Sequence, residues 1–98
     1  MVMATRTTIR FPLGRVVATP GALKAIEESG GHPKEYLDRH ASGDWGCVDA
    51  EDWKANDDAL RTGARLLSAY KLRDNTKIWV ITEAEPRAAT TLLLPNEY

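Results

Sequence analysis

The last third of the chain decides the fold and reads RLLSAYKLRDNTKIWVITEAEPRAATTLLL from Arg65 to Leu94. Two segments rich in apolar residues, 65–72 and 77–83, flank the turn-forming residues 73–76. This pattern predicts a β-hairpin. A proline then ends the second segment, because proline cannot donate to a strand ladder, and residues 89–94 supply a third strand. The stretch therefore predicts an antiparallel meander of three strands.

The residues before this stretch carry helix signals instead. Thr19 is a good N-cap with proline directly after it, which predicts a helix over about 20–29. A second short helix is expected over about 33–41, and Asp49 caps a third that ends at a glycine. A short β-branched run, 14–18, precedes all three. Helices followed by strands imply an α+β fold with the order β-α-α-α-β-β-β.

Length and composition indicate one small domain. With 98 residues, the chain is expected to form a flexible polar arm over residues 1–10 and a single α+β domain over residues 11–98. No run is apolar and long enough to span a bilayer, and the start lacks the apolar core of a secretory signal. The single cysteine and two histidines are too few for a disulfide or a structural zinc site. We expect a cytoplasmic protein without cofactor, metal or membrane contact.

Charge is distributed unevenly, although the net charge is only −1. Residues 1–26 carry bases and no acid, residues 27–58 are strongly acidic, and residues 59–98 are again more basic than acidic. Such asymmetry can form a dipolar surface that steers a charged partner. The alternative is that acids solvate the helices while the strands happen to carry the bases. The sequence leaves both open.

Alternation along the expected strands makes both faces of the sheet apolar. Ile78 and Val80 point to one face, and Trp79 and Ile81 point to the other. A second apolar face that helices do not cover suggests a partner surface or a homodimer contact. Alternatively, the N-terminal arm folds over it.

The middle of the chain holds the candidate binding residues. Trp45 lies in a loop between two glycines, where an indole either fills a gap in the core or anchors a partner. Asn56 shares a helical stripe with Trp53 and Leu60, which we expect in the core. A buried Asn must spend its amide on hydrogen bonds, and the loop over residues 43–46 is its expected partner. The candidate binding residues are Asp44, Trp45, Asp49, Asp52, Asn56 and Trp79.

His40 is the candidate for acid–base chemistry, because a histidine can gain and lose a proton near neutral pH. A single histidine on a helix face can equally be packed and hydrogen-bonded in the core. The acidic residues after it do not have the spacing of an EF-hand loop. Cys47 lies among acids and is a poor nucleophile candidate. No nucleophile elbow, phosphate loop, dinucleotide fingerprint or zinc-protease pattern is present.

Several segments together resemble a known family. They are FPLGRVVATPGAL from Phe11, RHASGDWG from Arg39, LSAY from Leu67, IWVITEA from Ile78 and the ending TTLLLPNEY. The chain resembles, over nearly its whole length from Phe11, small bacterial proteins of plasmids, integrative elements and phages, sometimes labelled plasmid-related or restriction-modification associated. This resemblance implies a mobile-DNA context, in which accessory genes often encode small inhibitors of host defence such as anti-CRISPR and anti-restriction proteins.

A second resemblance is architectural. Helices followed by an antiparallel meander look like the barnase–colicin–RelE group of ribonucleases, which cleave RNA without metal. That likeness implies catalytic side chains on the sheet and on a preceding helix. The positions that could form such a set here are His40, Arg65, Tyr70, Lys77, Arg87 and Thr90.

Two functional hypotheses follow. The first is a non-enzymatic interaction module of mobile elements that inhibits host defence by binding another protein or a protein–nucleic-acid complex. In this hypothesis, the acidic middle segment occupies a site meant for phosphates and Trp45 is the anchor. The alternative is a small metal-independent ribonuclease with His40 as acid–base group and a basic side chain stabilising the transition state. The first hypothesis assigns no catalytic residues.

Overall fold

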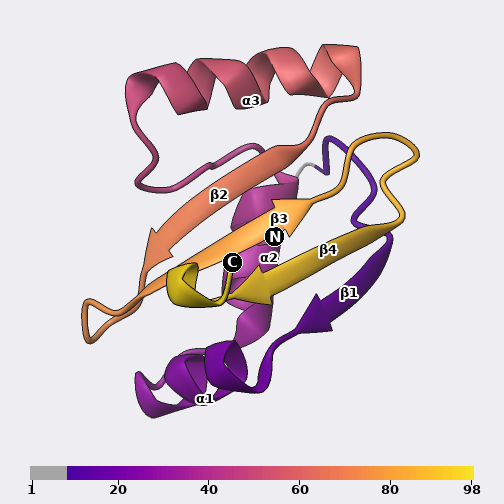
Figure 1. The fold of residues 1–98 in the computed structure, drawn as a ribbon. Helices are drawn as coiled ribbons and strands as arrows, with labels where there is room; N and C mark the ends of the chain where they lie inside the picture. The colour runs from indigo at the N-terminus through magenta and orange to yellow at the C-terminus, as the bar shows by residue number, and fades with distance from the viewer. Residues whose placement is uncertain (1–8) are drawn as a thin grey trace, which may run out of the picture.

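The computed structural model describes residues 9–98, so the predicted arm lies almost wholly outside the described residues. The α+β class is confirmed, with helices α1 and α2 against one face of a sheet and α3 along the edge strand β2 (Figure 1). In chain order the elements are β1 (Arg15–Ala18), α1 (Pro20–Glu28), α2 (Pro33–Ala41), α3 (Ala50–Thr62), β2 (Leu66–Lys71), β3 (Lys77–Thr82), β4 (Ala89–Leu93) and the 3-10 helix η1 (Pro95–Glu97).

The sheet has four strands in the order β1-β4-β3-β2 and is mixed. β2, β3 and β4 pair antiparallel, as in the predicted meander, but the sheet does not end there, because β1 joins it parallel to β4. Gly14 makes the addition feasible. Its φ is +67°, and a Cβ there would lie 2.4 Å from the carbonyl oxygen of Arg87, so only glycine lets the two backbones approach. Arg15 N then donates to Ala88 O at 2.9 Å.

The helix caps follow the sequence closely. Thr19 Oγ1 accepts from Ala22 N at 3.0 Å at the start of α1, and Asp49 Oδ1 accepts from Asp52 N at 2.8 Å at the start of α3. Each bond satisfies a backbone N–H that has no partner inside its helix. Gly63 ends α3 in the left-handed conformation. Local chemistry therefore sets where these helices begin and end.

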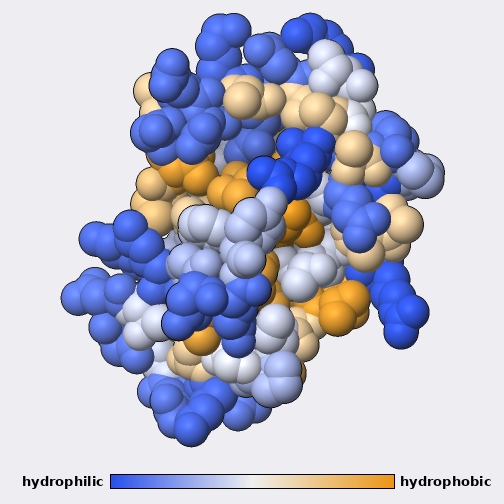
Figure 2. All heavy atoms as spheres, in the orientation of Figure 1, coloured by the Kyte–Doolittle hydropathy of each residue, from blue (hydrophilic) through white to orange (hydrophobic). Residues whose placement is uncertain are grey.

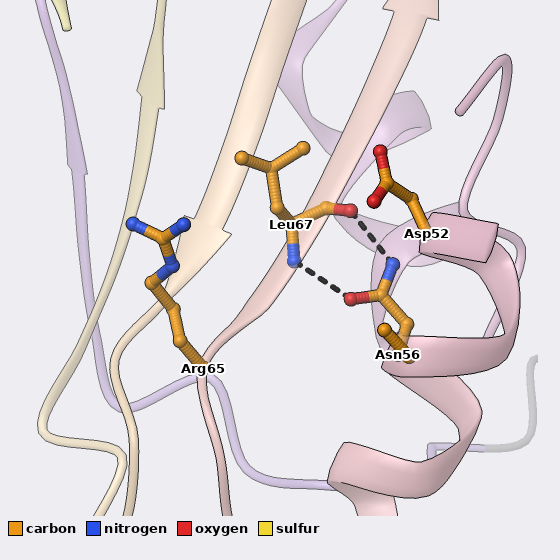
Figure 3. A pocket seen from close by; sticks show the side chains of 5 residues that line it. Asp52, Asn56, Arg65 and Leu67 are labelled. Carbon is orange, nitrogen blue, oxygen red and sulfur yellow. Dashed lines mark hydrogen bonds between the residues drawn. The ribbon is translucent and has the colours of Figure 1, made fainter. Parts of the chain in front are cut away.

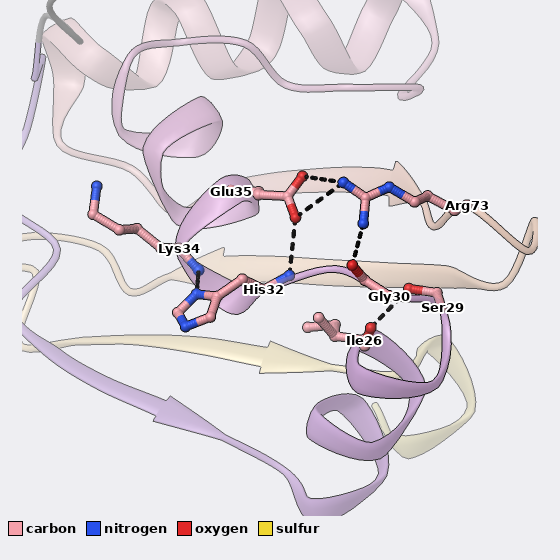
Figure 4. A network of polar contacts seen from close by, with 7 residues as sticks. All are labelled: Ile26, Ser29, Gly30, His32, Lys34, Glu35 and Arg73. Atoms are coloured by element: carbon pink, nitrogen blue, oxygen red, sulfur yellow. Dashed lines mark hydrogen bonds and ion pairs between the residues drawn. The ribbon is translucent and has the colours of Figure 1, made fainter.

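A polar network ties the connection between α1 and α2 to the β2–β3 turn (Figure 4). Glu35 Oε1 accepts from His32 N at 2.9 Å, and His32 Nδ1 accepts from Lys34 N at 3.1 Å, which together cap α2. Arg73 in the turn donates to the Glu35 carboxylate at 3.2 Å and to the carbonyl oxygen of Gly30. The pair is exposed, so it orients the helices more than it stabilises them.

The core lies between the sheet and α1 and α2. Ile78 and Val80 are fully buried there, while Trp79 and Ile81 point to the opposite face, as the alternation predicts. The first core cluster contains Ala22, Ile26, Tyr36, Tyr70, Leu72, Ile78, Val80 and Leu92. A second, smaller cluster near α3 contains Phe11, Trp45, Ala59 and Leu66.

The buried stripe of α3 differs from the expected one. Asn56 and Ala59 are buried and Leu60 is half-buried, but Trp53 is 36% exposed, so its assignment to the core is wrong. The reason is the position of the helix: α3 flanks the edge of the sheet instead of lying on its face. A helix at an edge buries only a narrow stripe, and Trp53 falls outside it.

Asn56 and the loop around Gly46 close the outer edge of β2. Asn56 Nδ2 donates to Leu67 O at 2.7 Å, and Leu67 N donates to Asn56 Oδ1 at 3.1 Å, so the side-chain amide replaces a neighbouring strand. Beside it, Ala69 N donates to Trp45 O and Cys47 N donates to Ala69 O. The predicted burial of Asn56 is confirmed at 5% exposure, but its expected partner is wrong. The loop bonds to the same edge of β2 at Ala69, two residues after Leu67.

Replacing Asn56 by Ala should lower the free energy of unfolding by on the order of 1–3 kcal/mol, because the N–H and C=O of Leu67 lose their partners in a half-buried place. Urea denaturation measures the change. Asp58→Ala is the control on the same helix. It removes only exposed ion pairs to Lys54 and Arg61, which should cost no more than about 0.5 kcal/mol. Equal shifts of the two urea midpoints would contradict this role of Asn56.

Candidate functional site

The face of the sheet away from α1 and α2 is not covered by any of the three α-helices in the described part of the chain (Figure 1). Figure 2, in the same orientation, shows apolar and intermediate side chains across the middle of this face, with hydrophilic ones among and around them. Cross-strand pairing places the same side chains together on it. We call this surface the open face; its strand residues are Arg15, Val17, Leu67, Ala69, Lys71, Lys77, Trp79, Ile81, Ala89, Thr91 and Leu93.

The centre of the open face is an aromatic pair with an arginine. The rings of Trp79 and Tyr98 meet edge to face, with centroids 5.6 Å apart. Arg65, directly before β2, donates to the Tyr98 hydroxyl, and its guanidinium carbon lies 5.6 Å from the centroid of the same ring. Tyr98 is nevertheless 68% exposed. The three side chains therefore present apolar area and a cation to the solvent together.

A shallow pocket of about 230 Å³ joins the open face to α3 (Figure 3). Asp52, Ala55 and Asn56 line it from α3, and Arg65 and Leu67 line it from the sheet. The amide of Asn56 is already bonded to Leu67, so the polar groups left for a ligand are the Asp52 carboxylate and the Arg65 guanidinium. Side chains of opposite charge at one opening suit a polar segment of a partner better than a small apolar ligand.

Basic side chains stand at the margin of the open face. Arg15, Arg65, Lys71 and Lys77 point outward from it, and none of them makes an ion pair among residues 9–98. The outward positions of the strands hold no acid. The strand residues of the open face therefore carry positive charge only, although the whole chain is close to neutral.

The acidic candidate residues are mostly engaged within the fold. Asp44 accepts from Arg39 Nε at 2.7 Å and from Gly46 N at 3.0 Å. Partial burial works against ionisation of Asp44, but these hydrogen bonds hold its pKa below the ordinary value. Asp49 caps α3, whereas Asp52 is exposed beside the pocket. Of these three carboxylates, Asp52 is the one that a partner can reach without breaking an intramolecular contact.

Trp45 is fully buried, so the expectation that it anchors a partner is wrong. Its ring packs against Phe11 and His40, with centroid distances of 6.2 and 5.6 Å, and its Nε1 donates to Asp57 Oδ1 at 3.0 Å. The indole fills the space between the sheet and α3. Trp79, in contrast, lies half-buried at the centre of the open face, where a partner can contact it.

His40 is fully buried and belongs to a chain of hydrogen bonds across the sheet. Thr90 Oγ1 donates to Leu13 O at 2.7 Å, so its only proton is used and it must accept from Thr82, 2.6 Å away. Thr82 in turn accepts from His40 Nε2 at 2.9 Å, and His40 Nδ1 accepts from Ser68 Oγ at 2.6 Å. The network assigns a neutral imidazole with its proton on Nε2. Burial lowers the pKa of His40 to about 4, and the charge of Arg87 acts in the same direction.

The remaining residues of the ribonuclease-like set are not brought together. Tyr70 and Arg87 are buried. Tyr70 Oη donates to Asp44 O at 2.6 Å, and burial raises its pKa. Arg87 donates to Ala59 O and Ala64 O at the end of α3. Thr90 is buried in the His40 chain, while Arg65 and Lys77 lie on the open face, across the sheet from His40.

Sequence reasoning missed Tyr98 and Arg15 as members of the surface. Tyr98 follows η1, which turns the chain back over β3, and no local pattern indicates that return. Arg15 belongs to the face only because β1 joins the sheet beside β4. The alternation of Trp79 and Ile81 was the one signal that pointed to this side of the sheet.

Acidification should begin to destabilise the protein at pH values well above those at which carboxylates are usually protonated. His40 is protonated in the unfolded chain below its ordinary pKa of 6.5 but stays neutral in the folded protein down to about 4. The unfolded state therefore binds more protons in this window, and the free energy of unfolding falls by roughly 2–3 kcal/mol as pH drops through it. Urea midpoints between about pH 7.5 and about pH 4.5 measure the slope. A flat profile would mean that the folded protein accommodates the imidazolium.

Among residues 9–98, no helix has the length and apolarity to cross a membrane, and no three His, Cys, Asp or Glu side chains gather as a metal site would require. Comparison with protein-family models, with curated proteins and with solved structures gives no match. The open face, with its geometry and the chemistry of its side chains, is therefore the feature of the molecule that bears on function.

Proposed function

We propose that this chain is a non-enzymatic interaction module that binds another protein through the open face of its sheet. The observation that carries the proposal is the composition of that face: an apolar floor, an aromatic pair with Arg65 at its centre and unpaired bases at its margin. An apolar patch rimmed by polar side chains on a small domain is typical of a protein-binding surface.

The central residues are of the types that dominate binding energy in interfaces. Trp, Tyr and Arg are enriched among the residues whose truncation costs most, and they act from the middle of a contact surface. Trp79, Tyr98 and Arg65 are these three types, and Tyr98 contacts both of the others. Their prior packing reduces the side-chain entropy that is lost on binding. This cluster is the expected anchor, in the place that sequence reasoning gave to Trp45.

The margin favours a partner with acidic side chains around an apolar patch. Arg15, Lys71 and Lys77 are exposed and unpaired among the described residues. Charges at an interface rim steer association and select partners more than they add affinity. Binding to such a partner should weaken as salt concentration rises.

The more specific form of the proposal is an inhibitor of host defence encoded by mobile DNA, acting on a protein or a protein–nucleic-acid complex. Its support is the resemblance to small proteins of plasmids, integrative elements and phages. Asp52 beside the pocket retains the role expected of the acidic middle segment, that of contacting a basic site. Asp44 and Asp49 serve the fold instead.

The alternative, a metal-independent ribonuclease, has less support. A general acid or base must be within hydrogen-bond reach of its substrate, and His40 is enclosed by Phe11, Trp45 and the strand hydroxyls. Incubation of the protein with mixed RNA in EDTA tests this function directly. Cleavage that Arg65→Ala or Lys77→Ala abolishes would revive it with a site on the open face.

Trp79→Ala should reduce partner capture at least about tenfold, as expected for a central aromatic anchor. The measurement is quantitative co-purification with the tagged protein from a bacterial host that carries CRISPR and restriction systems. Nuclease treatment should leave the capture intact if the partner is bound as a protein. The same host tests the specific form, because wild type should raise the plating efficiency of a restricted phage and Trp79→Ala should not.

Lys77→Glu and Lys24→Glu form a matched pair for the margin. Both residues are exposed, but Lys77 lies on the open face and Lys24 lies on α1 at the opposite side of the sheet. Reversal at Lys77 should weaken capture, whereas reversal at Lys24 should change it by less than about twofold. Capture that is insensitive to Trp79→Ala and Lys77→Glu, with both variants folded, would place the binding surface elsewhere.

A further inference from the structure

The outer edge of β1 is open, in contrast to the edge of β2. β4 is the only neighbour of β1 in the sheet, and no described element lies beyond it (Figure 1). Val16 and Val17 are 46% and 43% exposed, one on each side of the sheet. An edge with exposed β-branched residues and no charge between them is a template for another strand.

The backbone groups that this edge offers can be assigned from the pairing with β4. Arg15 N donates to Ala88 O and Thr19 N donates to Leu92 O, so alternate residues along β1 face β4. The intervening residues, Val16 and Ala18, therefore direct their N–H and C=O groups outward. They stand symmetrically about Val17.

We propose that β1 pairs antiparallel with β1 of a second copy, about a two-fold axis that passes through Val17. In this register Val16 lies opposite Ala18 of the second copy, and Ala18 lies opposite its Val16. Each of these pairs exchanges both N–H···O bonds, because the outward donors and acceptors coincide. Val17 meets itself in the close, non-hydrogen-bonded position between them, where side-chain contact is greatest.

The charges of the same register are complementary. Arg15 lies opposite Thr19 of the second copy, not opposite the other Arg15. Thr19 Oγ1 donates to Glu97 Oε1 at 2.7 Å, which holds the Glu97 carboxylate beside that position. Arg15 and Val17 point to the open face, and the hydrogen bond from Thr19 holds Glu97 of η1 at the end of β1. In this register, Arg15 of each copy forms an ion pair with Glu97 of the other copy. The dimer therefore contains two such ion pairs, related by the two-fold axis.

This register makes the two sheets continuous, with both open faces on one side. The axis is perpendicular to the sheet, so α1 and α2 of both copies stay on the opposite side. Val17, at the border of each open face, becomes the centre of the combined surface. Dimerisation does not require the partner-binding proposal, because it uses the edge of β1 and not Trp79 or Tyr98.

Sedimentation equilibrium over a wide concentration range tests the dimer and its register. Wild type should approach twice the monomer mass at high concentration. Val17→Lys and Val17→Glu should each remain monomeric, because the axis places like charges opposite each other. An equimolar mixture of the two variants should recover the dimer, since only position 17 meets itself across the axis.

Leu23→Lys is the matched control, an apolar residue of similar exposure on α1, and it should dimerise as wild type does. Val16→Pro is a second probe: it removes an outward N–H that has no role inside the monomer, so it should abolish dimerisation and keep the circular dichroism spectrum. A wild type that stays monomeric, single Val17 variants that dimerise, or a mixture that does not recover the dimer would each overturn the proposal.

Discussion

The helix side of the sheet depends on the hydrogen bonds that the buried imidazole of His40 makes with two strands. The imidazole accepts from Ser68 on β2 and donates to Thr82 on β3, from which the chain of hydrogen bonds runs through Thr90 on β4 to Leu13 before β1. One side chain of α2 is thereby connected to β2, β3 and β4 and to the segment that leads into β1. Each hydroxyl has a single proton, so the direction of the chain is fixed and the imidazole must stay neutral. A fully satisfied network of this kind favours one arrangement of the core over its competitors.

The residues with the most versatile side-chain chemistry consequently stabilise the fold. Trp45 and Phe11 enclose the imidazole, and Arg87 donates hydrogen bonds to carbonyl groups at the end of α3. Tyr70 holds the loop that closes the edge of β2. These side chains are therefore bonded or packed within the core on the helix side of the sheet. The open face keeps its apolar and basic side chains free, which is why binding is better supported than catalysis.

The sequence was informative wherever structure is set locally. Thr19, Asp49 and Gly63 mark helix ends through their own side chains or backbone conformation, and the alternation from Ile78 to Ile81 correctly separates the two faces of β3. It was uninformative where distant segments meet. β1 joins β4 because Gly14 admits a backbone contact with residues more than seventy positions away. Likewise, the burial of Trp45 depends on where α3 lies, since Asp57 of that helix accepts from its indole.

The two edges of the sheet are treated differently, and the difference limits how the protein can assemble. A sheet with two open edges can add copies without end, which leads to fibres. Here the amide of Asn56 and the backbone around Gly46 occupy the outward groups of Leu67 and Ala69, so β2 offers no template over these residues. Among residues 9–98, β1 alone keeps an open edge, and in the proposed two-fold contact the β1 edge of each copy is occupied by that of the other. Because Asn56 and the backbone around Gly46 together close the edge of β2, the proposed pairing through β1 stops at two copies.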